Sequence, residues 1–131
     1  MKTHVTEIRV PYADTDQMGT VYYANYLVYF ERGRTEWLRA IGVSYKDLEG
    51  RGVLLPVMES TCVYHAPARY DDVLAIHTSV AESGFASMVF SYEIKRAGTV
   101  ITTGTTKHPF VNREFKPIRV PREIQAILAV P

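Results

Sequence analysis

The sequence predicts an α+β fold in which one five-stranded sheet packs against one dominant helix. Two observations support this prediction: one long segment near the N-terminus has helical periodicity, and most of the chain after it alternates between apolar and polar residues. Short turns join the alternating segments, so the sheet is expected to be mainly antiparallel. With 131 residues, the chain is expected to form a single domain over residues 1–131.

The first third of the chain is expected to contain one strand and the helix. Residues 3–10 alternate as a strand does, and residues 11–20 are expected to form a loop. From Val21 to Ile41 apolar residues recur every three or four positions, which predicts an amphipathic helix about 30 Å long. Gly42 suits the C-terminal cap of this helix, and residues 44–52 are expected to form a short helical turn.

The rest of the chain is expected to supply the other four strands. These are residues 54–65, 73–83, 86–96 and 99–111. Ala97-Gly98 is expected to form a hairpin turn, and the threonine-rich segment that follows suits a sheet. Residues 112–117 are expected to form a polar turn, and residues 121–129 a short closing helix or strand. A sheet of this size can wrap around the helix.

Composition excludes several classes of protein. The formal net charge is +1, from 15 basic and 14 acidic residues, which argues against nucleic-acid binding by bulk electrostatics. A single cysteine, Cys62, excludes an internal disulfide. No apolar run is long enough to span a membrane and the N-terminus lacks an apolar signal region, so a cytoplasmic location is expected.

Two carboxylates stand just before the helix. Asp14 and Asp16 are followed by Gln17, Met18 and Gly19. Both aspartates could simply be turn residues, since aspartate is common in loops. A calcium loop would continue with further oxygen ligands at alternating positions, so a metal site is disfavoured, and no cofactor is expected.

The same residues could also perform acyl-transfer chemistry. The start of a helix exposes free N–H groups with partial positive charge. An ionised aspartate there could attack a carbonyl or deprotonate water, while N–H groups near Tyr22 and Tyr23 polarise the carbonyl oxygen. Gly19 would let the backbone approach a ligand. No serine stands in a nucleophile elbow, and the four histidines, which lack metal-ligand spacing, are expected to be structural or on the surface.

The segment from Tyr12 to Tyr26, with Asp14, Asp16 and Gly19, resembles the signature of the 4-hydroxybenzoyl-CoA thioesterase-like hot-dog family. Residues 31–38 and 66–72 resemble the Tol–Pal-associated acyl-CoA thioesterase branch, and the resemblance extends from about Thr6 to Pro121. It implies a hot-dog fold and hydrolysis of acyl-CoA thioesters. It also implies a homodimer with sites at the interface, which assembles into a homotetramer.

The resemblance also assigns the catalytic residues. It places the catalytic carboxylate at Asp16, as nucleophile or as general base, and leaves Asp14 to orient the loop. The oxyanion donor maps onto the backbone N–H of Tyr23, which carries a phenol where several relatives have histidine.

The resemblance also indicates where substrate would bind. The implied substrate-binding residues are Gly19, Tyr22, Tyr26, Met58, Arg113, Lys116 and Arg119. The tyrosines and the methionine would line the acyl site, although core packing explains them equally well. The three cations would bind the CoA phosphates, although they could equally belong to a solvated turn. Residues 82–87 lack the basic residue found in the hydroxybenzoyl-CoA branch.

Two other functions stay open at this stage. A hot-dog hydratase or dehydratase would need a histidine near Asp16, and none stands in its loop. A non-catalytic acyl-CoA-binding module would have little use for a carboxylate beside a thioester. The acyl group, and the choice between CoA and acyl-carrier protein, are also open.

Overall fold

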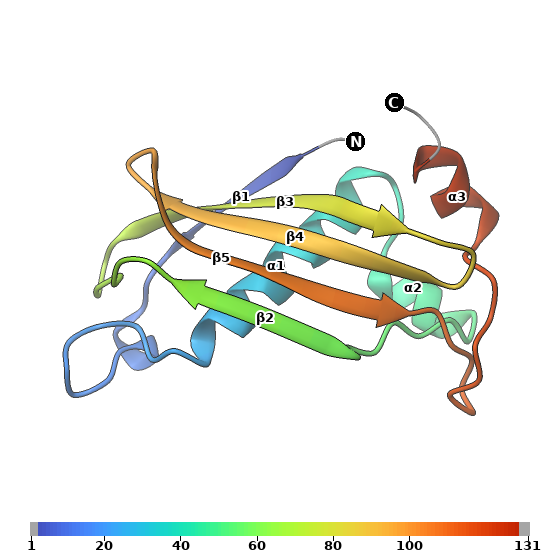
Figure 1. Cartoon of the computed structure of the whole chain (residues 1–131), viewed down its shortest axis with the longest axis horizontal. Helices are drawn as coiled ribbons and strands as arrows, with labels where there is room; N and C mark the ends of the chain where they lie inside the picture. Colours follow the sequence, from blue (N-terminus) through green and yellow to red (C-terminus); the bar gives the residue numbers. More distant parts are fainter. Residues whose placement is uncertain (1–2, 129–131) are drawn as a thin grey trace.

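The computed structural model describes residues 3–128 as a five-stranded antiparallel sheet packed on one long helix (Figure 1). The strands are β1 (His4–Arg9), β2 (Glu59–Tyr64), β3 (Val73–Ser83), β4 (Ser87–Arg96) and β5 (Thr99–Pro109). The helices are the 3-10 turn η1 (Tyr12–Asp14), α1 (Asn25–Ala40), α2 (Tyr45–Gly50) and α3 (Arg122–Leu128). The strand order is β1-β3-β4-β5-β2, so β1 and β2 form the edges. The predicted α+β class and antiparallel sheet are confirmed.

The long helix begins later than predicted. α1 starts at Asn25 and not near Val21. The N–H of Val21 donates to the carbonyl of Ala68 at 2.8 Å, and Val21 also forms a bridge with Thr15. These bonds hold the segment before Asn25 against the loop and against the turn that precedes β3. The helix therefore begins only at Asn25.

The other end of α1 follows the prediction. Gly42 has a φ of +86°, in the left-handed region that favours glycine, and the N–H of Val43 bonds to the carbonyl of Leu38 at 2.9 Å. The buried face of α1 carries Tyr26, Tyr29, Phe30, Gly33, Arg34, Trp37 and Leu38. Phe30 stacks on Tyr92 of β4 with ring centroids 4.3 Å apart. The core therefore lies between α1 and the sheet.

The edge strand β2 is shorter than predicted. It begins at Glu59, and Leu54 makes only an isolated bridge with Val111. Pro56 has no N–H to donate. The pairing is therefore interrupted between the bridge at Leu54 and the N–H of Met58, which donates to the carbonyl of Lys107 at 2.8 Å. The closing segment forms a helix, α3, which was one of the two expected forms; Ala129 lies outside the described residues.

A buried polar network crosses β4 and β5. The fully buried His108 has Nε2 2.7 Å from the hydroxyl of Thr106 and Nδ1 3.2 Å from the carbonyl of Leu55. The hydroxyl of Tyr92 lies 2.6 Å from the same threonine. Burial lowers the pKa of His108 to about 4, and the positive charge of Arg34 acts in the same direction.

His108 predicts an acid-sensitive fold. Between pH 6.5 and about 4 the unfolded chain binds a proton at this histidine that the folded chain does not. The free energy of unfolding should therefore fall as pH is lowered through this window, by up to about 3 kcal/mol. Urea unfolding from pH 7 to pH 4 measures it, with His108→Gln as the reference. A stability difference between the two proteins that stays constant with pH would contradict this prediction.

Candidate active site

The loop before α1 is closed by its own backbone. The N–H of Asp16 donates to the carbonyl of Thr20, and the N–H of Gly19 donates to the carbonyl of Asp16, both at 2.9 Å. Gly19 has a φ of +79°, a conformation that a side chain would disfavour. This tight loop gives Asp16 one defined position.

Asp16 lies at the edge of a pocket of about 330 Å³. Its side chain is half-buried, and its Oδ1 accepts a hydrogen bond from the N–H of Met18 at 2.9 Å. Its Oδ2 has no hydrogen-bond partner among residues 3–128. The lining includes Asp16, Tyr23, Tyr26, Tyr64, His65 and Pro67. One carboxylate oxygen is therefore anchored and the other is available to a ligand.

The start of α1 supplies free hydrogen-bond donors beside this pocket. Ala24 is the N-cap, and no side chain caps the helix there. The N–H groups of Tyr23 and Ala24 find no acceptor in the described part of the chain, although Tyr22 donates to Asp14 and Asn25 donates to Tyr22. Such donors carry partial positive charge and favour an oxyanion. The structure thus brings the two sequence-predicted catalytic residues, Asp16 and Tyr23, to one pocket.

Asp14 holds the loop against the helix. Its Oδ2 accepts a hydrogen bond from the hydroxyl of Tyr29 at 2.8 Å. Its carbonyl accepts from the N–H of Tyr22 and from Nδ2 of Asn25, both at 2.9 Å. Burial, and next the hydrogen bond to Asp14, raise the pKa of Tyr29, so its hydroxyl stays a donor. These contacts agree with the orienting role expected for Asp14.

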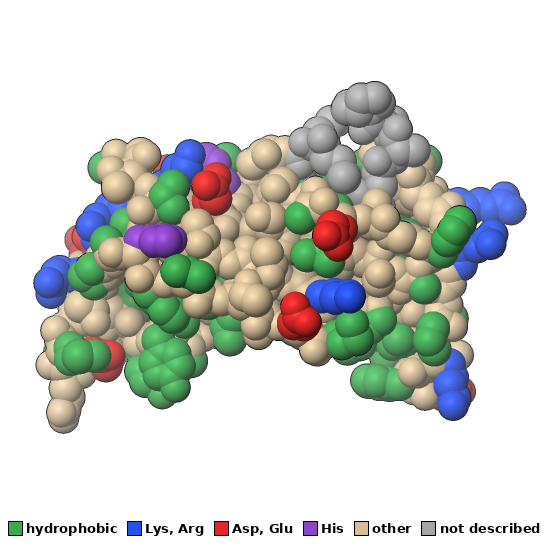
Figure 2. All heavy atoms as spheres, in the orientation of Figure 1, with side chains coloured by type: hydrophobic (Ala, Val, Ile, Leu, Met, Phe, Trp, Pro, Cys, Tyr) green, Lys and Arg blue, Asp and Glu red, His purple; other side chains and the backbone are tan. Residues whose placement is uncertain are grey.

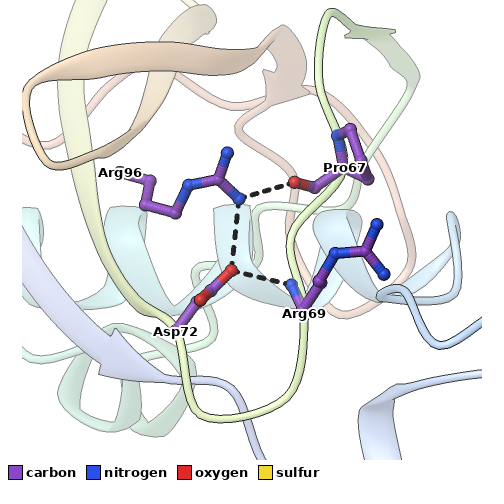
Figure 3. Close-up of polar contacts among 4 residues, drawn as sticks. All are labelled: Pro67, Arg69, Asp72 and Arg96. Carbon is purple, nitrogen blue, oxygen red and sulfur yellow. Dashed lines mark hydrogen bonds and ion pairs between the residues drawn. The ribbon is translucent and has the colours of Figure 1, made fainter.

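Another part of the pocket wall is a turn braced by an ion pair (Figure 3). Nη1 of Arg96 lies 2.7 Å from the carbonyl of Pro67 and 3.2 Å from Oδ2 of Asp72. The same carboxylate oxygen accepts from the N–H of Arg69 at 2.8 Å. The side chain of Arg69 points away from this cluster in Figure 3. The brace fixes the wall to which Ala66 and Pro67 belong.

Tyr64 and His65 are among the pocket residues that sequence reasoning did not predict as site residues. The hydroxyl of Tyr64 donates to the carbonyl of Tyr23 at 3.1 Å, and its ring meets Tyr26 edge-on at 5.3 Å. His65 lines the pocket too, with Nε2 3.2 Å from the hydroxyl of Thr103. Both residues directly precede Ala66, where the second recognised motif begins, and that adjacency was the one available signal.

The other predicted acyl-site residues are dispersed. Tyr26 lines the pocket, and Gly19 stands in the loop between two lining residues, Met18 and Thr20, without lining it itself. Tyr22 is exposed and tilts against Tyr23 with centroids 4.8 Å apart. Met58 is exposed at the start of β2, the opposite end from Tyr64. A six-residue strand is about 20 Å long. Within one chain, Met58 therefore cannot line the pocket at Asp16.

The three predicted CoA-binding cations lie at the far end of the molecule. Figure 1 draws the segment after β5 at one end of the sheet and the loop before α1 at the other. Nη2 of Arg113 donates to the carbonyl of Gly50 at 3.1 Å, and Arg119 lies over the ring of Phe85 at 5.7 Å. The N–H of Lys116 donates to Asn112 at 3.0 Å. A single chain does not bring these residues to Asp16.

Within residues 3–128, no cluster of three or more His, Cys, Asp or Glu side chains is arranged to hold a metal ion. In the same range, none of the helices has the length and apolar character needed to cross a membrane.

Comparison with known proteins gives one consistent result. The family model described as Thioesterase-like superfamily matches residues 10–128. YneP of Bacillus subtilis, provisionally named an acyl-CoA thioesterase, is 42% identical over 115 residues, covering 86% of this chain and 83% of the relative. Acyl-CoA thioesterase YbgC of Haemophilus influenzae is 35% identical over 121 residues, covering 91% and 89%. The solved structure of a DHNA-CoA thioesterase from Staphylococcus aureus has a TM-score of 0.93 at 32% identity, over 99% of this chain and 93% of that one.

Proposed function

The chain belongs to the thioesterase-like superfamily, and from this premise we propose how its pocket hydrolyses acyl-CoA. Its fold is the hot-dog fold, and it is an acyl-CoA thioesterase that releases a free acid and CoA. One observation carries the proposed mechanism: the Asp16 carboxylate and the unbonded N–H groups at the start of α1 meet at one pocket.

In the proposed mechanism the thioester carbonyl lies between Asp16 and the N–H of Tyr23. Asp16 either attacks the carbonyl carbon, so that CoA leaves as thiolate and water then cleaves the mixed anhydride, or takes a proton from a water that attacks directly. Both routes consume one water and regenerate the carboxylate. The N–H of Tyr23 stabilises the oxyanion, an interaction worth about 10²–10³ in kcat when such a donor is removed elsewhere. Gly19 leaves room for the thioester.

The acyl group is proposed to pack on the aromatic part of the pocket. Tyr26 and Tyr64 line it, and aromatic rings provide large contact areas for planar or apolar groups. The relative from Staphylococcus aureus is named for DHNA-CoA, which makes aromatic acyl groups the first substrates to test. Tyr22 and Met58 remain predictions as acyl-site residues.

The enzyme is proposed to act as a homodimer joined along β2, with a homotetramer as a further assembly. β2 is an edge strand with exposed Val63 and Tyr64 (53% and 46%). In Figure 1, β2 runs along the lower edge of the molecule. Figure 2, in the same orientation, shows hydrophobic side chains toward both ends of this edge. Antiparallel pairing of two such edges would place the far end of one subunit beside the pocket of the other. Arg113, Lys116 and Arg119 would then reach CoA bound at the neighbouring site.

A thiol-release assay over a panel of acyl-CoA esters tests this function. The panel contains aromatic, short branched and straight-chain acyl groups, each also offered on acyl-carrier protein. Hydration of enoyl-CoA is measured in parallel, because His65 gives the pocket the imidazole that a hydratase needs. Thiol release from at least one ester that depends on Asp16 supports the mechanism, whereas hydration without thiol release contradicts it. The cytoplasmic location remains a prediction, tested by cell fractionation.

Tyr64→Phe is expected to slow turnover without unfolding the protein. The lost hydroxyl frees the carbonyl of Tyr23, and a hydrogen bond to that carbonyl polarises the N–H of Ala24 in the same peptide group. The N–H of Ala24 is the second unbonded donor at the start of α1, and we propose that it assists the N–H of Tyr23 in stabilising the oxyanion. A neutral hydrogen bond of this kind corresponds to a fall in kcat of about two- to tenfold, with KM little changed. Steady-state thiol release measures both constants. An unchanged kcat would mean that the hydroxyl of Tyr64 does not support the oxyanion site.

A further inference from the structure

Arg34 is a buried cation without a counter-ion. It lies on α1 with 9% of its surface exposed, and no carboxylate in residues 3–128 forms an ion pair with it. Its Nε is fully buried and has no hydrogen-bond partner there. The positive charge of Arg34 acts to lower the pKa of both Tyr92 and His108. Neither residue supplies a negative charge, because burial raises the pKa of the Tyr92 hydroxyl and keeps His108 neutral. A buried charge is costly unless a second group compensates it, so a partner for Arg34 is missing from the single chain.

The missing partner would enter through a pocket beside β2. Arg34 lines a pocket of about 300 Å³ with Leu27 and Val28 of α1 and with Val57, just before β2. These three apolar side chains are exposed. Glu31, one helical turn before Arg34, lines the same pocket; it is exposed and takes part in no ion pair within the described residues. The patch therefore combines one unpaired cation, one unpaired anion and an apolar surround.

We propose that α1 of a second copy covers this pocket and that Arg34 of each subunit pairs with the partner subunit's Glu31. This proposal rests on the β2-linked dimer proposed above. In a two-fold interface the same patch meets itself, so a patch with one charge of each sign can form two reciprocal ion pairs. A small ligand would have to supply its own anion and would leave Glu31 unpaired. The self-complementary charges thus favour a second copy as the occupant.

Charge reversal in two separate chains tests the pairing. Glu31→Arg and Arg34→Glu each place like charges against each other in their own homodimers. Each variant alone should weaken dimerisation at least about 100-fold, measured by sedimentation equilibrium. An equimolar mixture should recover a dissociation constant within about tenfold of wild type, since a mixed dimer restores both pairs. Arg32→Glu, a reversal on an exposed arginine of the same helix, serves as the matched control and should dimerise like wild type.

The outcomes separate the pairing from the dimer itself. A mixture that stays as dissociated as its components would overturn the pairing, because a Glu31–Arg34 pair within one chain is not restored by mixing. A wild-type chain that is monomeric would instead overturn the proposed dimer, whatever its thiol-release activity.

A second pair of variants covers the case in which Arg34→Glu does not fold, which circular dichroism detects. Glu31→Gln and Arg34→Met should then each weaken the dimer at least about tenfold, and the double variant no further. Independent, multiplying effects would overturn the proposal. So would an Arg34→Met variant that dimerises normally but raises KM selectively for acyl groups ending in a carboxylate, because that result makes substrate the partner of Arg34.

Discussion

Asp16→Asn is expected to lower kcat by about 10³-fold or more while the protein stays folded. An amide neither attacks a thioester carbonyl as an ionised carboxylate does nor accepts a proton from water at neutral pH. It does keep an oxygen where Oδ1 accepts the hydrogen bond from the N–H of Met18, so the loop should retain its shape. Thiol release from the best acyl-CoA of the panel measures the loss, and a thermal melt checks the fold.

Asp14→Asn is the control for this prediction. Its side chain accepts from Tyr29, and its carbonyl, which the substitution leaves intact, accepts from Tyr22 and Asn25. An amide oxygen can replace the carboxylate in the contact with Tyr29, so the fall in kcat should be much smaller. The assignment of Asp16 fails if Asp16→Asn retains wild-type turnover on every acyl-CoA that the enzyme hydrolyses.

Local patterns predicted most of the fold. Strands β3, β4 and β5 lie where alternation placed them, because side chains that face a core on one side repeat with a period of two. The end of α1 could be predicted from Gly42 alone, because glycine readily adopts the positive φ that ends a helix. The start of α1 did not follow from periodicity, because the N–H of Val21 is bound by Ala68, far along the chain. Tertiary contacts of this kind leave no local signal.

The site was predictable where one segment builds it. Asp16, Gly19 and Tyr23 stand within a single loop, so their proximity follows from their spacing. Tyr64 and His65 reach the pocket only because β2 lies beside the start of α1, a neighbourhood set by the order of the whole sheet. Met58 stands just before β2, at the end opposite Tyr64, and the basic cluster follows β5 at the other end of the sheet. Spacing within one chain therefore could not indicate whether these residues reach a pocket of another subunit.

Gly104→Ala is expected to cause the largest loss of stability among single methyl additions in the sheet. Gly104 pairs with Cys62 on β2 and with Tyr92 on β4. A Cβ at this position would overlap the backbone carbonyl of Thr61 and lie 2.7 Å from Cζ of Phe30. Phe30 cannot retreat easily, since its ring stacks on Tyr92. Overpacking against a backbone atom and a fixed ring should cost about 3 kcal/mol, or roughly 10 °C in Tm.

Gly50→Ala provides the matched comparison for this substitution. Gly50 is the last residue of α2, and a Cβ there would meet nothing within 4 Å. The added methyl group should leave Tm unchanged or raise it slightly, because alanine loses less backbone entropy than glycine in a helix. Differential scanning calorimetry of the two variants therefore isolates the clash at Gly104 from the general effect of replacing glycine. Equal Tm values for the two variants would mean that β2 and α1 can move away from β5 at little cost. The close packing that brings Tyr64 to the start of α1 would then not depend on glycine at position 104.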